Sequence, residues 1–486
     1  MTRFWRGDTF ATSRATLTPT LSRQRERGTT AVAKGDRTPT ARNTCAMARG
    51  SIDSMEHVNE KVPHIIVIGG GFGGLWATRA LRNEPVRITL IDRCNHHLFQ
   101  PLLYQVATAG LSAPDIAAPL RHILRRQANV DVRLAEVTAI EPAQRRVALG
   151  DGSTLDYDTL VLASGATHAY FGHDEWAPHA PGLKTLDDAL QLRRRLLLAF
   201  ERADAETDAE RRAGWLSFAI IGGGPTGVEL AGTLAEIARH TLRREFRHID
   251  PAQAKVRLIE AGPRVLSSFP EKLSAKARKQ LERLGVEVVT GAPVTEITTD
   301  GYRIGAEFVR AHTVVWAAGV AGSSLARSLG VPLDRAGRVP VAADLSVPDH
   351  PEIFVIGDLA AVSQDGKPVP GVAPAAKQMG NHVASVIRDR LNGEPNAAFR
   401  YRDYGNLATI GRMAAVVDLH GLRFSGALAW WFWLVAHVLF LIGFRNRLVV
   451  MLNWTWAYWS YQRAARIIVG NTAGDARQVR GDNSSA

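Results

Sequence analysis

Cysteine is scarce in this 486-residue chain, which contains only Cys45 and Cys94. Two cysteines exclude a disulfide framework and a four-cysteine metal site, and they fit a reducing compartment. The sequence offers no serine–histidine–acid set either. The pair His96 and His97 does not indicate a metal site, because adjacent residues point in different directions in a strand. We therefore expect no metal, and an enzyme of this composition would take its chemistry from a bound cofactor.

No secretory signal is expected, because the N-terminal segment lacks an apolar core. Residues 1–54 carry ten basic side chains against four acidic ones, which is half of the net charge of +12. Three interpretations remain open: a flexible tail, an Arg-rich organellar presequence, or sequence upstream of a true start at Met47 or Met55. Because the excess charge lies in a segment without periodicity, it does not indicate a nucleic-acid partner. We expect residues 1–60 and 471–486 to be disordered.

The chain does contain the same glycine-rich loop twice, as I-I-V-I-G-G-G-F-G-G at 65–74 and A-I-I-G-G-G-P-T-G at 219–227. In each copy an apolar strand leads into a G-x-G-x-x-G turn and a helix, which is typical of a dinucleotide-binding βαβ unit. The helix N-terminus would then face the phosphates with its partial positive charge. The glycines of the pattern are Gly69, Gly71 and Gly74 in the first loop and Gly222, Gly224 and Gly227 in the second.

A carboxylate follows each loop at the end of a later strand, where it can accept hydrogen bonds from an adenosine ribose. Asp92 lies eighteen residues beyond Gly74, and Glu260 ends the strand expected at residues 255–259. A carboxylate at Glu260 repels a 2′-phosphate and so favours NADH over NADPH. Arg264, four residues later, could weaken that preference. Two such loops indicate that electrons pass between two bound nucleotides.

Further candidate residues lie at turns and at one helix start. Gly357 and Asp358 end an apolar strand, and this carboxylate suits the ribityl chain of a flavin. Gly165 is assigned to the flavin site and Gly319 to the NADH site. Glu229 is expected in the first turn of the helix after the second loop, where helix stabilisation and a nicotinamide contact remain equally open.

The order of these segments predicts an α/β fold with two Rossmann-like dinucleotide-binding domains, the NAD domain inserted in the FAD domain. We expect the FAD-binding domain at 61–182 and 313–396, the NADH-binding domain at 183–312, and a C-terminal helical membrane-anchoring region at 397–470.

The C-terminal region is apolar and rich in tryptophan. Residues 427–444 form one apolar run and residues 448–461 another, and six of the eleven tryptophans lie between Trp430 and Trp459. Eighteen helical residues span about 27 Å, at the margin of a bilayer core. A single span and a buried core helix with a dimer interface remain open. We favour two short helices lying in one leaflet.

The run N-H-H-L-F-Q-P-L-L-Y-Q-V-A-T at 95–108, with A-P-A-A-K-Q-M-G at 373–380 and V-I-G-D at 355–358, resembles the type II NADH:quinone oxidoreductases. V-V-W-A-A-G at 314–319 and the extended second loop at 222–232 add to the resemblance. It implies FAD at the first loop and NADH at the second. It also implies hydride transfer to the flavin, two-electron reduction of a membrane quinone, and no proton pumping.

The resemblance further implies that the segment containing Ala376, Lys377 and Gln378 lines the flavin ring and the quinone headgroup. Gln378 would face both, and Lys377 would tune the flavin or proton delivery, with a capping or surface role as its alternative. The C-terminal helices would hold a homodimer on membrane lipid at the cytoplasmic face of a bacterial inner membrane.

Other flavoproteins share the two loops. A pyridine nucleotide–disulfide reductase or a sulfide:quinone oxidoreductase requires cysteines at the flavin, and here Cys94 stands alone near the ribose end. A soluble ferredoxin reductase would not need the apolar C-terminus. A flavoprotein whose redox state gates partner binding stays open as a second role.

Overall fold

The computed structural model describes residues 62–441, 444–460, 463 and 465–468. The two extensions expected at residues 1–60 and 471–486 lie outside the described residues.

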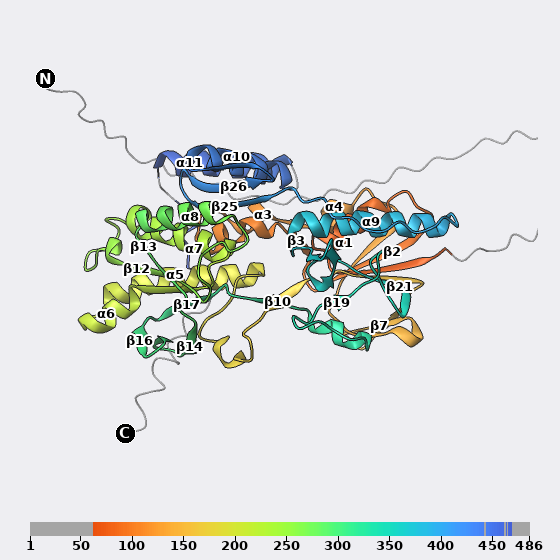
Figure 1. The fold of residues 1–486 in the computed structure, drawn as a ribbon, viewed down its shortest axis with the longest axis horizontal. Helices are drawn as coiled ribbons and strands as arrows, with labels where there is room; N and C mark the ends of the chain where they lie inside the picture. Colours follow the sequence, from red (N-terminus) through yellow and green to blue (C-terminus); the bar gives the residue numbers. More distant parts are fainter. Residues whose placement is uncertain (1–61, 442–443, 461–462, 464, 469–486) are drawn as a thin grey trace, which may run out of the picture. The chain divides into compact units, whose positions relative to one another are not determined.

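A six-stranded sheet forms the first α/β unit, with the strand order β20-β21-β9-β1-β2-β5. Its strands β1, β2, β5, β9 and β21 run parallel, and their apolar side chains form a buried core. Helices α1 and α9 pack side by side next to this sheet (Figure 1). The strands are β1 (His64–Ile68), β2 (Arg87–Asp92), β5 (Val130–Leu134), β9 (Thr159–Leu162), β20 (Ser346–Val347) and β21 (His350–Val355), and the helices are α1 (Phe72–Ala80) and α9 (Ala373–Leu391).

The second unit is a four-stranded parallel sheet, ordered β13-β12-β11-β17. All of its strands lie between β9 and β21 in the sequence, so this unit is inserted in the first, as the sequence predicts. Its strands are β11 (Ser217–Ile221), β12 (Lys255–Glu260), β13 (Val286–Thr290) and β17 (Thr313–Trp316), and its helices are α5 (Leu186–Ala205), α6 (Ala209–Trp215), α7 (Pro225–Glu236) and α8 (Glu271–Arg283).

The expected boundary between residues 312 and 313 is wrong. Phe218 pairs with Thr313 and Ile221 with Trp316, so β17 belongs to the second sheet. The chain crosses back only after Trp316, where β18 (Val320–Gly322) pairs antiparallel with β10 (Ala166–His168). All four residues of β17 are buried, and such an apolar run suits a parallel strand of either sheet, so the sequence did not reveal its partner.

A three-stranded antiparallel sheet, which the sequence analysis did not predict, precedes the C-terminal helices. It consists of β25 (Asn406–Gly411), β26 (Ala414–Leu419) and β27 (Leu422–Ser425). Helices α7 and α8 contact this sheet, and α10 (Ala427–Phe440) packs against it as well (Figure 1). Gly232 permits the close approach of α7 to β25, because a Cβ at this glycine would lie 1.6 Å from the Ile410 carbonyl oxygen.

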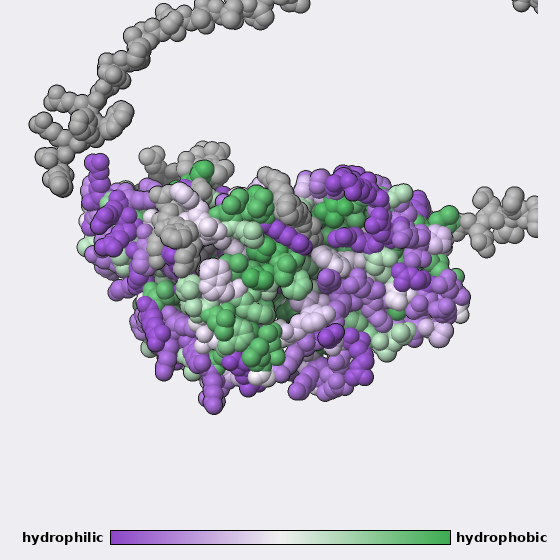
Figure 2. Space-filling view, turned by 90° about the horizontal axis from the view of Figure 1, so that it is seen from above, coloured by the Kyte–Doolittle hydropathy of each residue, from purple (hydrophilic) through white to green (hydrophobic). Residues whose placement is uncertain are grey.

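The first C-terminal helix is shorter than its apolar run, whereas the second helix begins four residues before its run. Helix α10 ends at Phe440, four residues before the end of its run, and α11 covers Phe444–Ser460. Among the described residues, no helix is both long and apolar enough to cross a membrane. Exposed apolar side chains of α10 and α11 form a patch that is surrounded by polar residues (Figure 2). The patch includes Leu428, Trp431, Phe432, Val435, Leu439, Phe440, Leu448, Met451, Leu452 and Trp456.

The fold also contains shorter elements. They are β3 (His96–Leu98), α2 (Leu103–Ala107), α3 (Ala113–Ile116), β4 (Ala117–Pro119) and α4 (Leu120–Leu124), with the peripheral strands β6 (Val137–Glu141), β7 (Arg146–Leu149), β8 (Thr154–Asp156), β14 (Val294–Ile297), β15 (Gly301–Ile304) and β16 (Glu307–Arg310).

Candidate active site

The first glycine loop is shaped by contacts of its own backbone. Gly69 has φ +104°, and a Cβ there would lie 2.4 Å from the Ala163 carbonyl oxygen. At Gly74 a Cβ would lie 1.9 Å from the Gly69 oxygen, so α1 can approach the end of β1 this closely only because residue 74 is glycine. Gly71 differs, because no atom of the described chain lies within 4 Å of the Cβ position. The fold therefore requires Gly69 and Gly74, whereas Gly71 leaves open space for a ligand.

Asp92 holds this loop from the end of β2. Its two carboxylate oxygens accept hydrogen bonds from the backbone N–H of Gly70 at 2.6 Å and of Cys94 at 2.7 Å. A carboxylate oxygen has two lone pairs, so each can accept a further bond from a ribose hydroxyl. The expected position at the strand end is confirmed.

The second loop repeats this construction. Gly222 has φ +112°, a Cβ at Gly227 would lie 1.9 Å from the Gly222 oxygen, and the Cβ position of Gly224 has no described neighbour within 4 Å. Glu260 accepts hydrogen bonds from the N–H groups of Gly223 at 2.6 Å and Gly262 at 2.7 Å. Both loops therefore pair a strained turn with a carboxylate and an open glycine, which suits a dinucleotide at each.

Two residues near the second loop are engaged elsewhere. Arg264 donates to the carbonyl oxygens of Phe269 at 2.6 Å and Ser267 at 2.8 Å, so its guanidinium braces its own loop. Gly319 lies against Phe171, whose ring would be 2.5 Å from a Cβ at this glycine, and its carbonyl accepts from Ala169. Gly319 thus packs at the point where the chain passes from the second unit back to the first.

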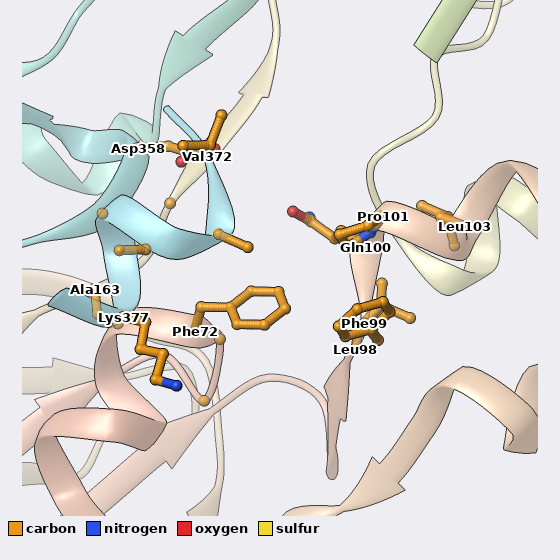
Figure 3. A pocket seen from close by; sticks show the side chains of 18 of the residues that line it. Phe72, Leu98, Phe99, Gln100, Pro101, Leu103, Ala163, Asp358, Val372 and Lys377 are labelled. Carbon is orange, nitrogen blue, oxygen red and sulfur yellow. The ribbon is translucent and has the colours of Figure 1, made fainter. Parts of the chain in front are cut away.

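One cavity of about 1830 Å³ joins the two units and the C-terminal helices. Phe72 points into it from α1, between Lys377 on one side and Phe99 on the other (Figure 3). Most of the expected flavin-side residues line it, namely Gly69, Gly71, Asp92, Gly165, Gly357, Asp358, Ala376, Lys377 and Gln378. From the second unit, Pro225, Thr226 and Glu229 line it. The expected site residues that do not line it are Gly74 of the first loop and Gly222, Gly224, Gly227, Glu260 and Gly319 on the NADH side.

Asp358 has a cationic neighbour that the sequence analysis missed. Asp358 lies in a short helical turn after β21, where Gly357 adopts φ +73°. The Lys184 ammonium lies 3.5 Å from its carboxylate, and both side chains are about one-fifth exposed. The Lys184 carbonyl in turn accepts a hydrogen bond from Gln100 at 3.0 Å. Residues so far apart in the chain give no local signal of this pairing.

The side chain of Gln378 is committed to an unexpected partner. Its amide nitrogen donates to the Arg402 carbonyl, and its amide oxygen accepts from the Arg402 N–H, both at 2.9 Å. One N–H and one lone pair of the amide remain for a ligand. Lys377 occupies the fifth position of α9, with its ammonium 5.2 Å from the centre of the Trp76 ring, so it does not cap the helix.

The expected place of Glu229 in the first helical turn is wrong. It is the fifth residue of α7, which has no acidic residue in its first turn. The side chain is 9% exposed, and burial raises the pKa of its carboxyl well above the usual value despite a hydrogen bond from the Thr409 backbone. Burial likewise raises the pKa of Tyr104, whose hydroxyl accepts from Gln105 at 2.9 Å.

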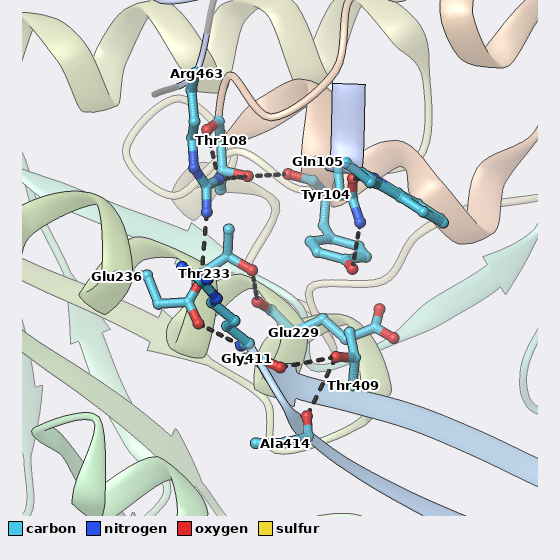
Figure 4. Close-up of polar contacts among 12 residues, drawn as sticks. Tyr104, Gln105, Thr108, Glu229, Thr233, Glu236, Thr409, Gly411, Ala414 and Arg463 are labelled. Atoms are coloured by element: carbon cyan, nitrogen blue, oxygen red, sulfur yellow. Dashed lines mark hydrogen bonds and ion pairs between the residues drawn. The ribbon is translucent and has the colours of Figure 1, made fainter. Parts of the chain in front are cut away.

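Glu229 and Tyr104 belong to a polar cluster that joins α2, α7, β25 and the C-terminal segment (Figure 4). Arg463 donates to the Thr108 carbonyl at 3.0 Å and pairs with Glu236 at 3.4 Å. The cluster therefore fastens the C-terminal segment to the wall of the cavity.

Comparisons with known proteins agree with this geometry. The sequence profile of the family "Pyridine nucleotide-disulphide oxidoreductase" matches residues 63–380, and that of the "NDH2 C-terminal domain" matches residues 404–459. A type II NADH:quinone oxidoreductase of Mycobacterium tuberculosis is 46% identical over 424 residues, 84% of this chain and 91% of the relative. An internal alternative NAD(P)H-ubiquinone oxidoreductase of Arabidopsis thaliana is 30% identical, over 81% of this chain and 83% of the relative.

Solved structures share the fold. The structure of NDH2 from Plasmodium falciparum in complex with NADH has a TM-score of 0.76 at 20% identity, covering 84% of this chain and all of that one. A sulfide:quinone oxidoreductase from Aquifex aeolicus has a TM-score of 0.64 at 19% identity, covering 86% of this chain and 95% of that one.

The two loops, the inserted second sheet and the shared cavity define a two-nucleotide flavoprotein oxidoreductase. Within that class, the chain belongs to the type II NADH:quinone oxidoreductases. It uses FAD to transfer electrons from NADH to a quinone, and the cofactors expected from the sequence are confirmed.

Proposed function

We propose that the first loop holds the resident FAD and that the second loop receives NADH. The open space at Gly71 and the free lone pairs of Asp92 suit the pyrophosphate and ribose of FAD. Gly224 and Glu260 offer the same groups to NADH. Because Arg264 is engaged by backbone carbonyls and Glu260 carries negative charge, this second site favours NADH over NADPH.

The observation that carries the proposal is the single cavity. It is lined by the first loop, by Thr226 in the second loop and Glu229 just after it, and by Phe440 and Leu441 at the end of α10. A nicotinamide brought in from the second loop and a quinone brought in from the apolar helices would therefore reach the same flavin. Electrons would pass over contact distances within this one cavity.

Bound FAD would accept the hydride of NADH and supply two electrons to the quinone. The chain supplies orientation and exclusion of water. Asp358, paired with Lys184, holds the turn after β21 at the ribityl position. Ala376 and Gln378 bring α9 to the quinone side, and Lys377 places a cation at the same wall. Glu229 borders the nicotinamide side with a carboxyl whose pKa burial raises well above its usual value.

Asp358→Asn tests the flavin assignment. We expect a lower flavin-to-protein ratio after purification, because the amide loses both the charge paired with Lys184 and one acceptor oxygen. Asp365→Asn is the matched control, since Asp365 is 76% exposed and does not line the cavity. Equal flavin content in both variants would refute the assignment.

We further propose that α10 and α11 lie in one leaflet, on the cytoplasmic face of a bacterial inner membrane. The patch in Figure 2 supports this placement, because Trp431 and Trp456 are 48% and 62% exposed among aliphatic side chains. Tryptophan prefers the membrane interface, and two short helices without a span suit attachment to one leaflet. Flotation of inside-out and right-side-out vesicles followed by protease treatment would assign the face.

A homodimer is proposed from the resemblance to the family. Sedimentation of the detergent-solubilised protein at twice the mass of the 52.9 kDa chain would support it. Sedimentation at the mass of a single chain across the micromolar range would refute it.

A further inference from the structure

Helix α10 carries one titratable side chain, His437, in an otherwise apolar stretch. This histidine lines the part of the cavity formed by the C-terminal helices, together with Leu439 and Phe440. Its ring stacks on Trp433 with 4.1 Å between centroids and meets the Phe99 ring edge-on at 6.4 Å. A polar ring among aromatic and aliphatic neighbours suggests a role beyond packing.

The protonation state of His437 follows from its hydrogen bond. Nδ1 lies 2.8 Å from the Trp433 carbonyl oxygen, which can only accept, so Nδ1 carries the hydrogen. Burial among apolar groups lowers the pKa of His437 to about 4, so the ring is neutral near pH 7. Nε2 is then a bare acceptor, and within the described part of the chain no group donates a hydrogen bond to it.

An aromatic wall links His437 to the first glycine loop. Phe72 is part of that loop and begins α1, and its ring centroid lies 5.8 Å from that of Phe99. Phe99 in turn contacts His437. A planar headgroup entering from the apolar helices would slide along this wall toward the flavin, with the lone pair of His437 as a polar point on its path.

The redox state of the headgroup decides which form can use this acceptor. An oxidised quinone carries carbonyl oxygens, which only accept hydrogen bonds. A quinol carries hydroxyl groups, which donate. We propose that Nε2 of His437 accepts a hydrogen bond from the hydroxyl of the reduced headgroup, so that the enzyme binds quinol more tightly than quinone. The same factor favours formation of bound quinol from bound quinone.

His437 is thus a positioning residue for the product, an inference that rests on the proposed quinone site. Redox-inert probes test it without turnover. 4-Methoxy-1-naphthol resembles a quinol with one hydroxyl, and 1,4-dimethoxynaphthalene has the same ring without a donor. Titration calorimetry of the FAD-loaded, detergent-solubilised enzyme under anaerobic conditions would compare the two. We expect wild type to prefer the naphthol by about tenfold, the worth of one hydrogen bond in a dry site.

Substitutions of His437 distinguish the effect of its hydrogen-bond acceptor from that of its aromatic ring. His437→Phe keeps an aromatic ring on Trp433 but removes the lone pair, so both probes should bind with equal affinity. His437→Gln offers an amide oxygen and should restore a preference for the naphthol. His420→Phe is the matched control, because His420 lies in the turn before β27 and outside the cavity lining. Flavin content and bleaching by NADH report that each variant is folded.

A preference for the naphthol that persists in His437→Phe, or that is missing in wild type, would overturn the proposal. Equal weakening of both probes in His437→Phe would show that the ring only packs. A separate experiment tests the proposed quinone site. Failure of a short-chain quinone to reoxidise the NADH-reduced wild-type enzyme would refute that site. The ratio of the two probe affinities would still test the role of His437.

Discussion

Replacing Gly71 or Gly224 with alanine should weaken nucleotide binding without disturbing the fold. Both glycines have extended backbones, with φ −70° and −71°, which alanine adopts without strain. No described atom lies within 4 Å of either Cβ position, so the new methyl group meets only a bound nucleotide. The fold should be unharmed, or even more stable by about 0.4–1 kcal/mol, because alanine restricts the unfolded chain.

The nucleotide, by contrast, should lose its close approach. A methyl group at this point pushes the pyrophosphate off the backbone N–H groups, and a hydrogen bond to a charged group is worth about 1.5–3 kcal/mol. The affinity should therefore fall about 10- to 150-fold. Gly71→Ala should lower the flavin-to-protein ratio, whereas Gly224→Ala should retain FAD and raise the KM for NADH.

Purification, flavin absorbance, thermal unfolding and steady-state kinetics with NADH check both variants together. Gly74→Ala and Gly227→Ala serve as steric controls, because their methyl groups would lie 1.9 Å from backbone oxygens and should destabilise the fold itself by about 1–3 kcal/mol or more. FAD loss from Gly224→Ala, or full flavin with a raised KM for NADH in Gly71→Ala, would refute the assignment of the two loops.

The remaining predictions concern specificity, pH and membrane attachment. Glu260→Ala should lower the NADH-to-NADPH ratio of kcat/KM about tenfold or more, whereas Arg264→Leu should leave that ratio unchanged; an equal ratio in both variants would contradict the role of Glu260. Burial alone would raise the pKa of Asp188, but hydrogen bonds from His168 and from two backbone N–H groups outweigh it and lower the pKa to about 2. This carboxylate therefore stabilises the fold above its unfolded pKa near 3.8, and the contribution is lost as pH falls toward 2. Asp188→Asn should lower the free energy of unfolding in urea by about 1–2 kcal/mol at pH 7 and by less near pH 3. A loss of stability that does not depend on pH would contradict the lowered pKa of Asp188. A double Leu439→Asp and Leu452→Asp variant should no longer float with liposomes, whereas Leu134→Asp, at a similarly exposed position of 60%, should float like wild type.

Local signals explain what the sequence could predict. The glycine loops and the acids at the ends of β2 and β12 lie within single βαβ units, where spacing fixes geometry. Asp92 and Glu260 accordingly occupy the expected strand ends. The insertion followed from the late Gly357-Asp358 turn, which returns the chain to the first sheet.

Contacts between distant segments explain what it could not. The partner of Gln378 is the backbone of Arg402, and the partner of Asp358 is Lys184, 174 residues away. The strands β25, β26 and β27 are only six, six and four residues long, and runs this short were not recognised beside so apolar a C-terminus. His437 was visible as the polar member of that run, but only the Trp433 carbonyl shows which nitrogen is free.

Anaerobic double mixing determines whether one cavity serves both substrates. The FAD-loaded enzyme is mixed first with one equivalent of NADH and then with a short-chain quinone, while flavin absorbance is followed. We expect full bleaching by NADH and full reoxidation by quinone, with one quinol formed per NADH. Bleaching without reoxidation, in the presence of detergent or lipid, would contradict it.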